Sequence, residues 1–492
     1  MDVEKKKTTS FDSAEQGTYG DILNAPRQAV DHIRIGLIAC GYFEYWRMYP
    51  ALRERVERDI AMLHTRLSEN LEVVFPGIVD TLDAAESAGR ALAQAGVEVV
   101  IVVEGTYLPD FMVLAALEHV PNAKVILFNT QSGAGVSPQD VYEDTLRNSA
   151  LIGIAQLSGT FRKSNRPFQV VVGEISEAAA YDRIAGLVQA QQIAKRLRQF
   201  NIGLVGHVFR GMFDLEFDRG EIRGCLGPEV ITIQAEHLVD IWRDIPGSEV
   251  DEATDLLTGR FQMRALGRED VERSVRLGLA MRRLTEKYRL DAMCFLGQHY
   301  LEKMTSAPAR IGASMLMEGD RLMVSCEGDV GGLITMQIMH ELTGNAPVQM
   351  EWGQFDSERN AVFLLGHGIA SPEVASAPER VTLTPAPEEW GFEGYGANWE
   401  LILRPGPVTM AHVLATPGGW RMLISQGQSL EHPCMPIDEI HALVRVETPV
   451  RDYLQTVLEH GIAHHVIVVH GDCFERLQMV CDAMGMEKLV VC

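Results

Sequence analysis

Short apolar runs alternate with amphipathic stretches from about residue 33 onward, and this alternation limits the fold more than any other feature of the chain. The β-branched runs lie at residues 33–40, 71–79, 97–103 and 124–128. The segments between them, such as the alanine-rich 81–95, have helical patterns. Strands that alternate with helices at this spacing form parallel βαβ units in a doubly wound sheet. We therefore predict a Rossmann- or flavodoxin-like α/β domain over residues 32–198.

The same pattern continues to about residue 325 and then changes. Strands predicted at 201–206, 230–234 and 292–296 indicate a second α/β domain of this kind over residues 199–325. A helix before the last of them carries Leu277, Met281, Leu284 and Tyr288 on one face, which predicts core. Later strands, such as 399–403, are short, separated by Pro and Gly turns and expected to be antiparallel. We expect a β-rich, barrel-like C-terminal domain over 326–492 and a polar arm over 1–31.

Charge and composition argue against some classes of binding partner. A formal net charge of -23 argues against a nucleic-acid partner, because phosphates would be repelled over most of the surface. No apolar run reaches membrane-spanning length, and residues 1–16 do not have the pattern of a secretory signal. The 8 cysteines are scattered without a CxxC pair, so neither a disulfide framework nor a zinc ribbon is indicated. We expect a cytoplasmic protein without a membrane or nucleic-acid partner.

Four polar centres follow or end short apolar segments beside glycine. They are Glu327 in Cys326-Glu327-Gly328-Asp329, Glu351 in Met350-Glu351-Trp352-Gly353, His367 in Gly366-His367-Gly368, and the pair His464-His465. We expect Glu327, Glu351, His367 and His465 to bind one divalent cation. Such an O/N-rich set with open positions suits an octahedral Mn2+-like ion better than a closed structural zinc site.

Each centre also has an ordinary structural explanation. An isolated Glu is most often a solvated surface group. Alternation along a strand sends one ring of the pair inward and the other outward, so at most one should reach the metal. Asp329 and Asp356 are candidates for supporting or structural roles, and Asp329 suits the cap of a helix start.

These segments resemble the L-arabinose isomerase and L-fucose isomerase superfamily. The resemblance rests on the order and intervals of several short motifs: Thr106-Tyr107-Leu108-Pro109, Phe128-Asn129-Thr130-Gln131, Glu327-Gly328-Asp329, Met350-Glu351, Leu365-Gly366-His367 and Ala463-His464-His465. It implies that Glu327, Glu351, His367 and His465 bind the metal, which is Mn2+ or another divalent ion such as Mg2+ or Co2+. It also implies that Glu327 and Glu351 transfer protons in an aldose-ketose isomerisation. The family further implies two α/β domains, a β-rich C-terminal domain, and homotrimers or homohexamers with active sites between subunits.

The substrate is less well defined by this resemblance. Arabinose isomerases carry Gln-His-Leu-Tyr after the first strand, whereas this chain has Gly41-Tyr42-Phe43-Glu44-Tyr45. The segments Phe209-Arg210-Gly211-Met212 and Gln298-His299-Tyr300 also differ from those enzymes, and the Arg-x-Met pattern is nearer to the fucose branch. The candidate sugar contacts are Tyr107, Gln131 and His299, for which a packing aromatic, a turn-stabilising amide and a structural imidazole are the competing roles.

Three functions therefore remain open. The first is a metal-dependent isomerase of an unphosphorylated aldose, acting through an enediolate. The second is an isomerase of the same family whose substrate is a deoxy or otherwise modified sugar. The third is a non-catalytic sugar-binding protein, because two α/β domains around a cleft are also the plan of such modules.

Overall fold

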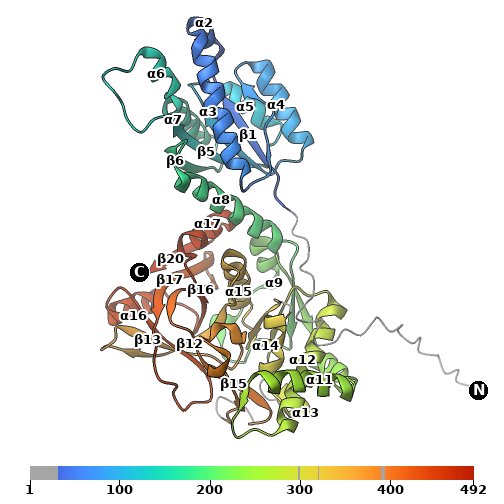
Figure 1. Cartoon of the computed structure of the whole chain (residues 1–492). Helices are drawn as coiled ribbons and strands as arrows, with labels where there is room; N and C mark the ends of the chain where they lie inside the picture. The colour runs from blue at the N-terminus through green and yellow to red at the C-terminus, as the bar shows by residue number, and fades with distance from the viewer. Residues whose placement is uncertain (1–31, 297–299, 320, 389–393, 492) are drawn as a thin grey trace, which may run out of the picture. The chain divides into compact units, whose positions relative to one another are not determined.

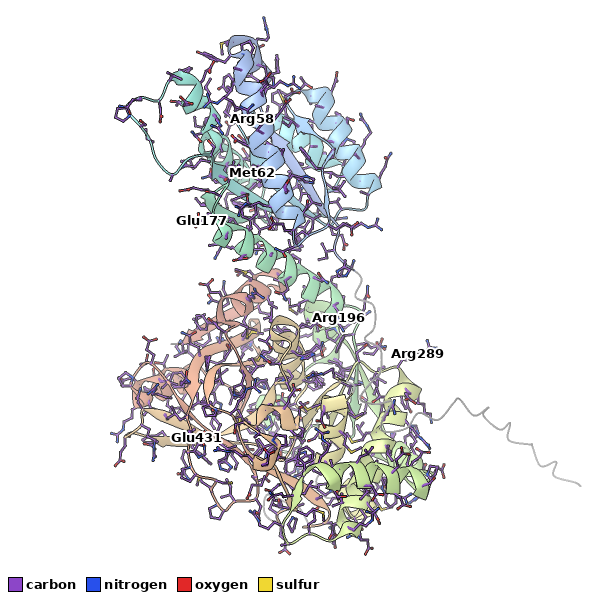
Figure 2. The ribbon with its side chains drawn as sticks, in the orientation of Figure 1. Arg58, Met62, Glu177, Arg196, Arg289 and Glu431 are labelled. Atoms are coloured by element: carbon purple, nitrogen blue, oxygen red, sulfur yellow. The ribbon has the colours of Figure 1, made fainter. Side chains whose placement is uncertain are left out.

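The computed structural model describes residues 32–296, 300–319, 321–388 and 394–491, and these residues form two compact units (Figure 1). The first unit extends to Gln192 and the second begins at Ile193. Helix α8 (Ala178–Leu197) contains the boundary. Arg196, labelled in Figure 2, lies on the part of α8 that belongs to the second unit. Its Nε is 3.4 Å from Glu341 Oε1. The predicted polar arm, 1–31, lies outside the described residues.

The first unit is built on one parallel sheet. Its described strands pair in the order β2-β1-β4-β5-β6, and β3 also pairs with β1. Their bounds are β1 (Ile35–Cys40), β2 (Val73–Val74), β3 (Ile78–Val79), β4 (Val99–Glu104), β5 (Lys124–Gln131) and β6 (Gln169–Glu174). Every residue of β1 and β4 is buried, which is typical of a parallel sheet covered on both faces. The predicted parallel α/β arrangement is confirmed for this unit, while its Rossmann or flavodoxin class stays a prediction.

The second unit contains another parallel sheet, whose described strands run in the order β11-β10-β7-β8. Their bounds are β7 (Asn201–Val205), β8 (Glu229–Ile233), β10 (Ala292–Phe295) and β11 (Met323–Cys326). Leu277, Met281 and Leu284 of the predicted helical stripe are buried, as expected. Tyr288 is only partly buried and its hydroxyl bonds to His237.

A large mixed sheet follows in the same unit. Its described strands run in the order β20-β17-β16-β19-β12-β13-β18-β15-β14-β9. Their bounds are β9 (Gln262–Met263), β12 (Val348–Asp356), β13 (Ala361–Leu365), β14 (Thr382–Pro385), β15 (Ala397–Ile402), β16 (Gly406–Thr416), β17 (Gly419–Ser429), β18 (Ile440–Arg445), β19 (His465–His470) and β20 (Glu487–Val491). Most neighbours are antiparallel, but β14–β9, β15–β18 and β17–β20 are parallel. β17 also pairs with β18 through two residue pairs, so the barrel-like closure stays a prediction.

Helices connect these strands. In the first unit they are α2 (Phe43–Met48), α3 (Pro50–Ser68), α4 (Leu82–Gln94), α5 (Asp110–Glu118), α6 (Tyr142–Arg147) and α7 (Ala150–Lys163). In the second they include α10 (Ala235–Arg243), α11 (Gly247–Arg260), α12 (Arg268–Tyr288), α13 (Tyr300–Thr305), α14 (Arg310–Gly319), α15 (Val330–Thr343), α16 (Val450–Glu459) and α17 (Phe474–Met484). No described helix combines the length and the apolar character needed to cross a bilayer.

The turn between β11 and α15 has an unusual backbone. Glu327 and Gly328 both have positive φ, 62° and 79°, which is a left-handed conformation that residues with a side chain rarely adopt. A side chain at 328 would also collide with neighbouring backbone, because a Cβ there would lie 2.5 Å from Val208 Cα. Glycine is therefore required where the chain turns sharply beside Glu327, and this turn fixes the direction of the Glu327 side chain.

We expect Gly328→Ala to lower the free energy of unfolding by roughly 2–5 kcal/mol, because left-handed strain and backbone overlap add together. Gly344→Ala is the matched control, since Gly344 has φ 71° but nothing within 4 Å of the added Cβ. Its expected cost is only about 1–2 kcal/mol. Urea denaturation of both variants measures the difference. Equal losses would mean that the contact with Val208 does not constrain the turn.

Candidate metal centre

The four predicted ligands come from four separate strands of the second unit or from the residues next to them. Glu327 directly follows β11, Glu351 lies in β12, His367 comes just after β13, and His465 opens β19. In the mixed sheet Glu351 is paired directly with His465 across β12 and β19. Residues opposite each other on neighbouring strands share a face of the sheet. The register therefore brings this carboxylate and this imidazole together although they are remote in sequence.

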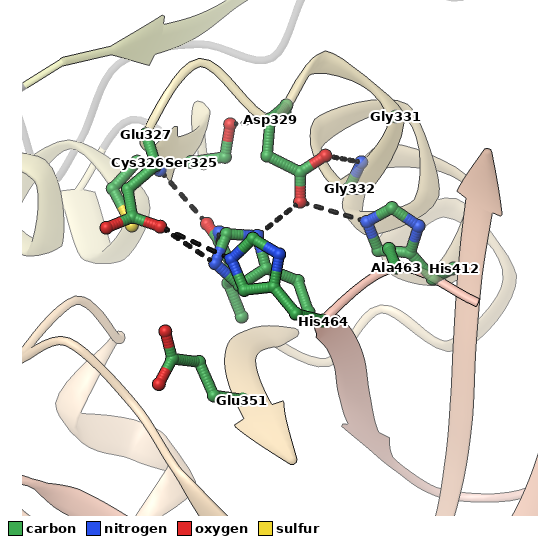
Figure 3. Close-up of polar contacts among 12 residues, drawn as sticks. Ser325, Cys326, Glu327, Asp329, Gly331, Gly332, Glu351, His412, Ala463 and His464 are labelled. Carbon is green, nitrogen blue, oxygen red and sulfur yellow. Dashed lines mark hydrogen bonds and ion pairs between the residues drawn. The ribbon is translucent and has the colours of Figure 1, made fainter. Parts of the chain in front are cut away.

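The distances show that all four predicted side chains converge. His465 Nε2 lies 3.2 Å from Glu327 Oε2, and His367 Nε2 lies 2.9 Å from Glu351 Oε1. His367 Nε2 is also 3.9 Å from Glu327 Oε1. Glu327, Glu351, His464 and His465 each offer one ligand atom, and these atoms all lie within 4.8 Å of one another (Figure 3).

His464 belongs to this cluster, which the sequence did not predict. The expected opposite orientation of the two neighbouring rings is not found, since their centroids lie 4.1 Å apart and His464 Nε2 is 3.6 Å from Glu327 Oε2. The physical reason is that β19 begins only at His465, so His464 precedes the strand and strand alternation does not govern its side chain. The sequence carries no mark of where this strand begins, so the orientation of His464 could not be predicted from it.

Asp329 bonds to the ring nitrogen of His465 that faces away from Glu327. Its Oδ2 lies 2.9 Å from His465 Nδ1 and 2.9 Å from His412 Nε2, while Oδ1 accepts a hydrogen bond of 2.7 Å from Gly332 N at the start of α15. Asp329 therefore caps the helix and also orients His465 so that Nε2 faces Glu327, as outer partners of metal-binding imidazoles do. His412 comes from the middle of β16, where no sequence pattern marked it. Asp356, by contrast, accepts bonds from Glu358 N and Arg359 N in the β12–β13 turn.

The charges of the cluster balance one another. Burial alone would raise the pKa of Glu327, but the imidazoles of His464 and His465 outweigh burial and hold that pKa well below its usual range. Burial would also raise the pKa of Glu351, but the hydrogen bond from His367 outweighs burial, and the pKa of Glu351 is lowered. Burial would lower the pKa of His465, but Asp329 and Glu327 raise it to about 10. Both carboxylates are therefore ionised at neutral pH.

These donors fit a divalent cation. Two ionised carboxylates and neighbouring imidazole nitrogens supply the mixed oxygen and nitrogen ligands that Mn2+, Co2+ and Zn2+ accept. The imidazoles would give up their protons on binding, so a cation would replace the charge that those protons supply.

The predicted sugar contacts are not part of this cluster as it is described. Tyr107 and Gln131 lie in the first unit. Tyr107 is half-buried, and its ring lies at right angles to that of Tyr42, with centroids 6.2 Å apart. Gln131 is exposed, and its amide donates a 2.6 Å hydrogen bond to Gly133 O, as a turn-stabilising residue would. His299 lies outside the described residues. Their contact with a sugar stays a prediction.

Comparison with known proteins indicates a class of enzyme. Residues 344–490 match the model of the L-fucose isomerase C-terminal domain, a span that contains Glu351, His367 and His465. Proteins named sulfoquinovose isomerase are similar over most of the chain. The one from Alkalicoccus urumqiensis is 25% identical over 338 residues, which is 68% of this chain and 74% of that protein. The one from Priestia megaterium is 25% identical over 350 residues, 70% of this chain and 76% of that protein.

A third protein of that name, from Clostridium sp. (strain MSTE9), is 24% identical over 357 residues, 70% of this chain and 77% of its own. The matched domain and these relatives together indicate a sugar isomerase, which is an intramolecular oxidoreductase.

Proposed function

We propose that this sugar isomerase is a divalent-metal-dependent aldose-ketose isomerase of a modified sugar, with a sulfonated hexose such as sulfoquinovose as the first candidate substrate. The observation that carries the proposal is the convergence of Glu327, Glu351 and His465 on one small volume, with His367 Nε2 2.9 Å from Glu351 Oε1. The relatives named for sulfoquinovose favour the modified sugar, which the sequence left open as an alternative, over an ordinary aldose.

The chemistry requires a proton to leave C2 and another to be delivered to C1, while the carbonyl moves from C1 to C2. Glu327 and Glu351 suit this task because both are ionised at neutral pH and lie at one site. Glu351 is the more accessible, with its side chain 21% exposed, whereas that of Glu327 is 4% exposed. We assign removal of the C2 proton to Glu351, with Glu327 on the deeper side.

The remaining residues orient these two carboxylates. His367 donates to Glu351 Oε1 and fixes that side chain, and Asp329 fixes His465 beside Glu327. A divalent cation held by Glu327, Glu351, His367 and His465 would stabilise the negative charge that develops on the two sugar oxygens. We propose Mn2+ for this role, with Mg2+ or Co2+ as substitutes.

Two further parts of the proposal come from the resemblance alone. A homotrimer or homohexamer with active sites between subunits would allow residues such as Tyr107 and Gln131 to contact the sugar. A non-catalytic sugar-binding role is less well supported, because such a role does not require two ionised carboxylates at one cation-sized site.

The test is a panel of sugars with the purified full chain. We expect chelator-treated protein to be inactive and Mn2+ to restore conversion of sulfoquinovose to its ketose, followed by NMR. The value of kcat/KM should exceed that for D-glucose, L-fucose or L-arabinose by at least about 100-fold, because a site built for a polar substituent rejects sugars that lack it. Absence of turnover for every aldose and ketose with metal present would refute the proposal.

A further inference from the structure

Strand β6 forms one edge of the parallel sheet of the first unit (Figure 1). Among the described strands it pairs only with β5, so its outer side presents backbone N–H and C=O groups that face no described strand. Val170 and Val172 of this strand are 40% and 69% exposed, and residues 169–173 carry no charge. An uncharged edge strand with exposed β-branched side chains readily pairs with another strand.

Other edges in the molecule are protected against such pairing. At the opposite edge of the same sheet, β2 has only two residues. At one edge of the mixed sheet, β20 carries Glu487 and Lys488. Their charged groups lie 3.1 Å from Arg421 and 2.7 Å from Asp482. Short strands and charged side chains are two ways in which proteins prevent edge pairing. The absence of both from the core of β6 indicates that this edge is covered in the assembled protein.

The two exposed valines lie on the face of the sheet that α7 covers. Val170 pairs with Leu127 of β5, so the two side chains share a face, and Val172 points to the same face two residues later. Leu127 belongs to a buried cluster that includes Phe161 of α7. That helix lies against β5 and β4 but leaves both valines exposed. A further strand beside β6 would give these side chains apolar neighbours.

The charges at the two ends of β6 define which strand fits there. Before the strand, the exposed Arg162 and Lys163 end α7, and the Arg162 guanidinium lies over the ring of Phe168, 5.0 Å from its centroid. After the strand, the exposed Glu177, labelled in Figure 2, accepts a 3.2 Å hydrogen bond from Glu174 N. Residues 162–173 include no acidic residue, and residues 169–182 include no basic one. The edge is therefore basic at its start and acidic at its end.

We propose that β6 pairs with β6 of a second copy of this chain, antiparallel and about a two-fold axis, so that two sheets become continuous. Antiparallel pairing places the basic start of one strand beside the acidic end of the other. A parallel pair would bring like charges together. The same surface is used by both copies, so each contact between them occurs twice. This interface is independent of the proposed function.

The first test measures the number of copies in the particle by sedimentation equilibrium of the full chain. A two-fold contact doubles whatever assembly other surfaces form, so we expect Val172→Lys to halve that number, because a lysine in an edge strand hinders pairing. Circular dichroism verifies that the variant is folded. The matched control is Leu82→Lys, since Leu82 is 46% exposed at the start of α4, which lies against β3. It should leave the number unchanged.

Two results of this measurement would overturn the proposal. One is a wild-type particle with an odd number of copies, which a two-fold contact of every copy does not allow. The other is a folded Val172→Lys variant with as many copies as wild type.

The second test reverses the charges. Lys163→Glu and Glu177→Lys each place like charges at both ends of the contact and should weaken association roughly 10-fold. The double variant restores opposite charges in exchanged positions and should associate as wild type does. Arg90→Glu on α4, where the Arg90 side chain is 57% exposed, changes the net charge as Lys163→Glu does and should have no effect. Single variants that associate normally, or a double variant that stays weakened, would rule out the antiparallel pairing.

Hydrogen exchange locates the contact. Pairing protects the amides on the outer side of β6, so their exchange should be at least about 10-fold faster in Val172→Lys than in wild type. The amides of β1, in the middle of the sheet, are the internal control and should not change. A particle that halves without faster exchange in β6 would place the two-fold contact elsewhere and overturn the proposal.

Discussion

Glu351→Gln should lower kcat by roughly 10³-fold or more while the protein stays folded, because the variant loses the proposed proton-transferring group, which is also a proposed metal ligand. The amide is nearly isosteric with the carboxylate but has no basic oxygen for a proton on carbon. The bond from His367 Nε2 to Oε1, now 2.9 Å, can persist to the amide oxygen. The measurement is the initial rate of ketose formation at saturating sugar and Mn2+, with unfolding monitored in parallel.

The control for this variant is Glu358→Gln. Glu358 lies on an exposed turn shortly after Glu351 in the chain, and its backbone N–H bonds to Asp356. Its replacement changes the net charge by the same amount and should leave the rate unaltered. A Glu351→Gln enzyme with more than a tenth of wild-type kcat would show that Glu351 does not transfer the proton. Glu327→Gln with sugar binding and biological function intact would instead favour a non-catalytic protein.

Much of the fold was visible in the sequence because its cause is local. Buried parallel strands such as β1 and β4 are continuous β-branched runs, and their positions were predicted to within a few residues. The short helix Phe43–Met48 after β1 is too brief to leave a helical pattern of this kind in the sequence. The division of the second unit into a central and a C-terminal domain stays a prediction, because β11 and the mixed sheet lie in one compact unit.

The convergence of the candidate ligands was predictable for a different reason. Glu327 follows a strand, His367 comes just after one and His465 opens one, and the order of the four candidates resembled a known family. The groups that orient them were not predictable, because Asp214 and His412 become neighbours only through tertiary packing. Left-handed φ at Glu327 also leaves no mark in the sequence except the glycine that follows it.

His465→Ala should weaken Mn2+ binding by more than the roughly 10–100-fold that the loss of an outer hydrogen-bond partner costs, because it removes a proposed ligand itself. His367→Ala should do the same, since its Nε2 lies beside both carboxylates. His464→Ala should weaken binding much less, because its Nε2 lies 3.6 Å from Glu327 Oε2, farther than the 3.2 Å of His465 Nε2. The affinities are measured by titration of the metal-free protein, followed by the electron paramagnetic resonance of free Mn2+.

The difference in Mn2+ affinity between the His464 and His465 variants tests direct coordination, because the two residues are neighbours. His464 and His465 are adjacent, and their rings lie 4.1 Å apart, so an indirect effect through folding or general electrostatics would act on both. Only direct coordination distinguishes them, because Asp329 aims Nε2 of His465 at Glu327 while Asp214 restrains His464 from another segment. Equal losses at the two positions would mean that the cation is bound by both imidazoles, and the assignment of His367 as the second nitrogen ligand would then be wrong.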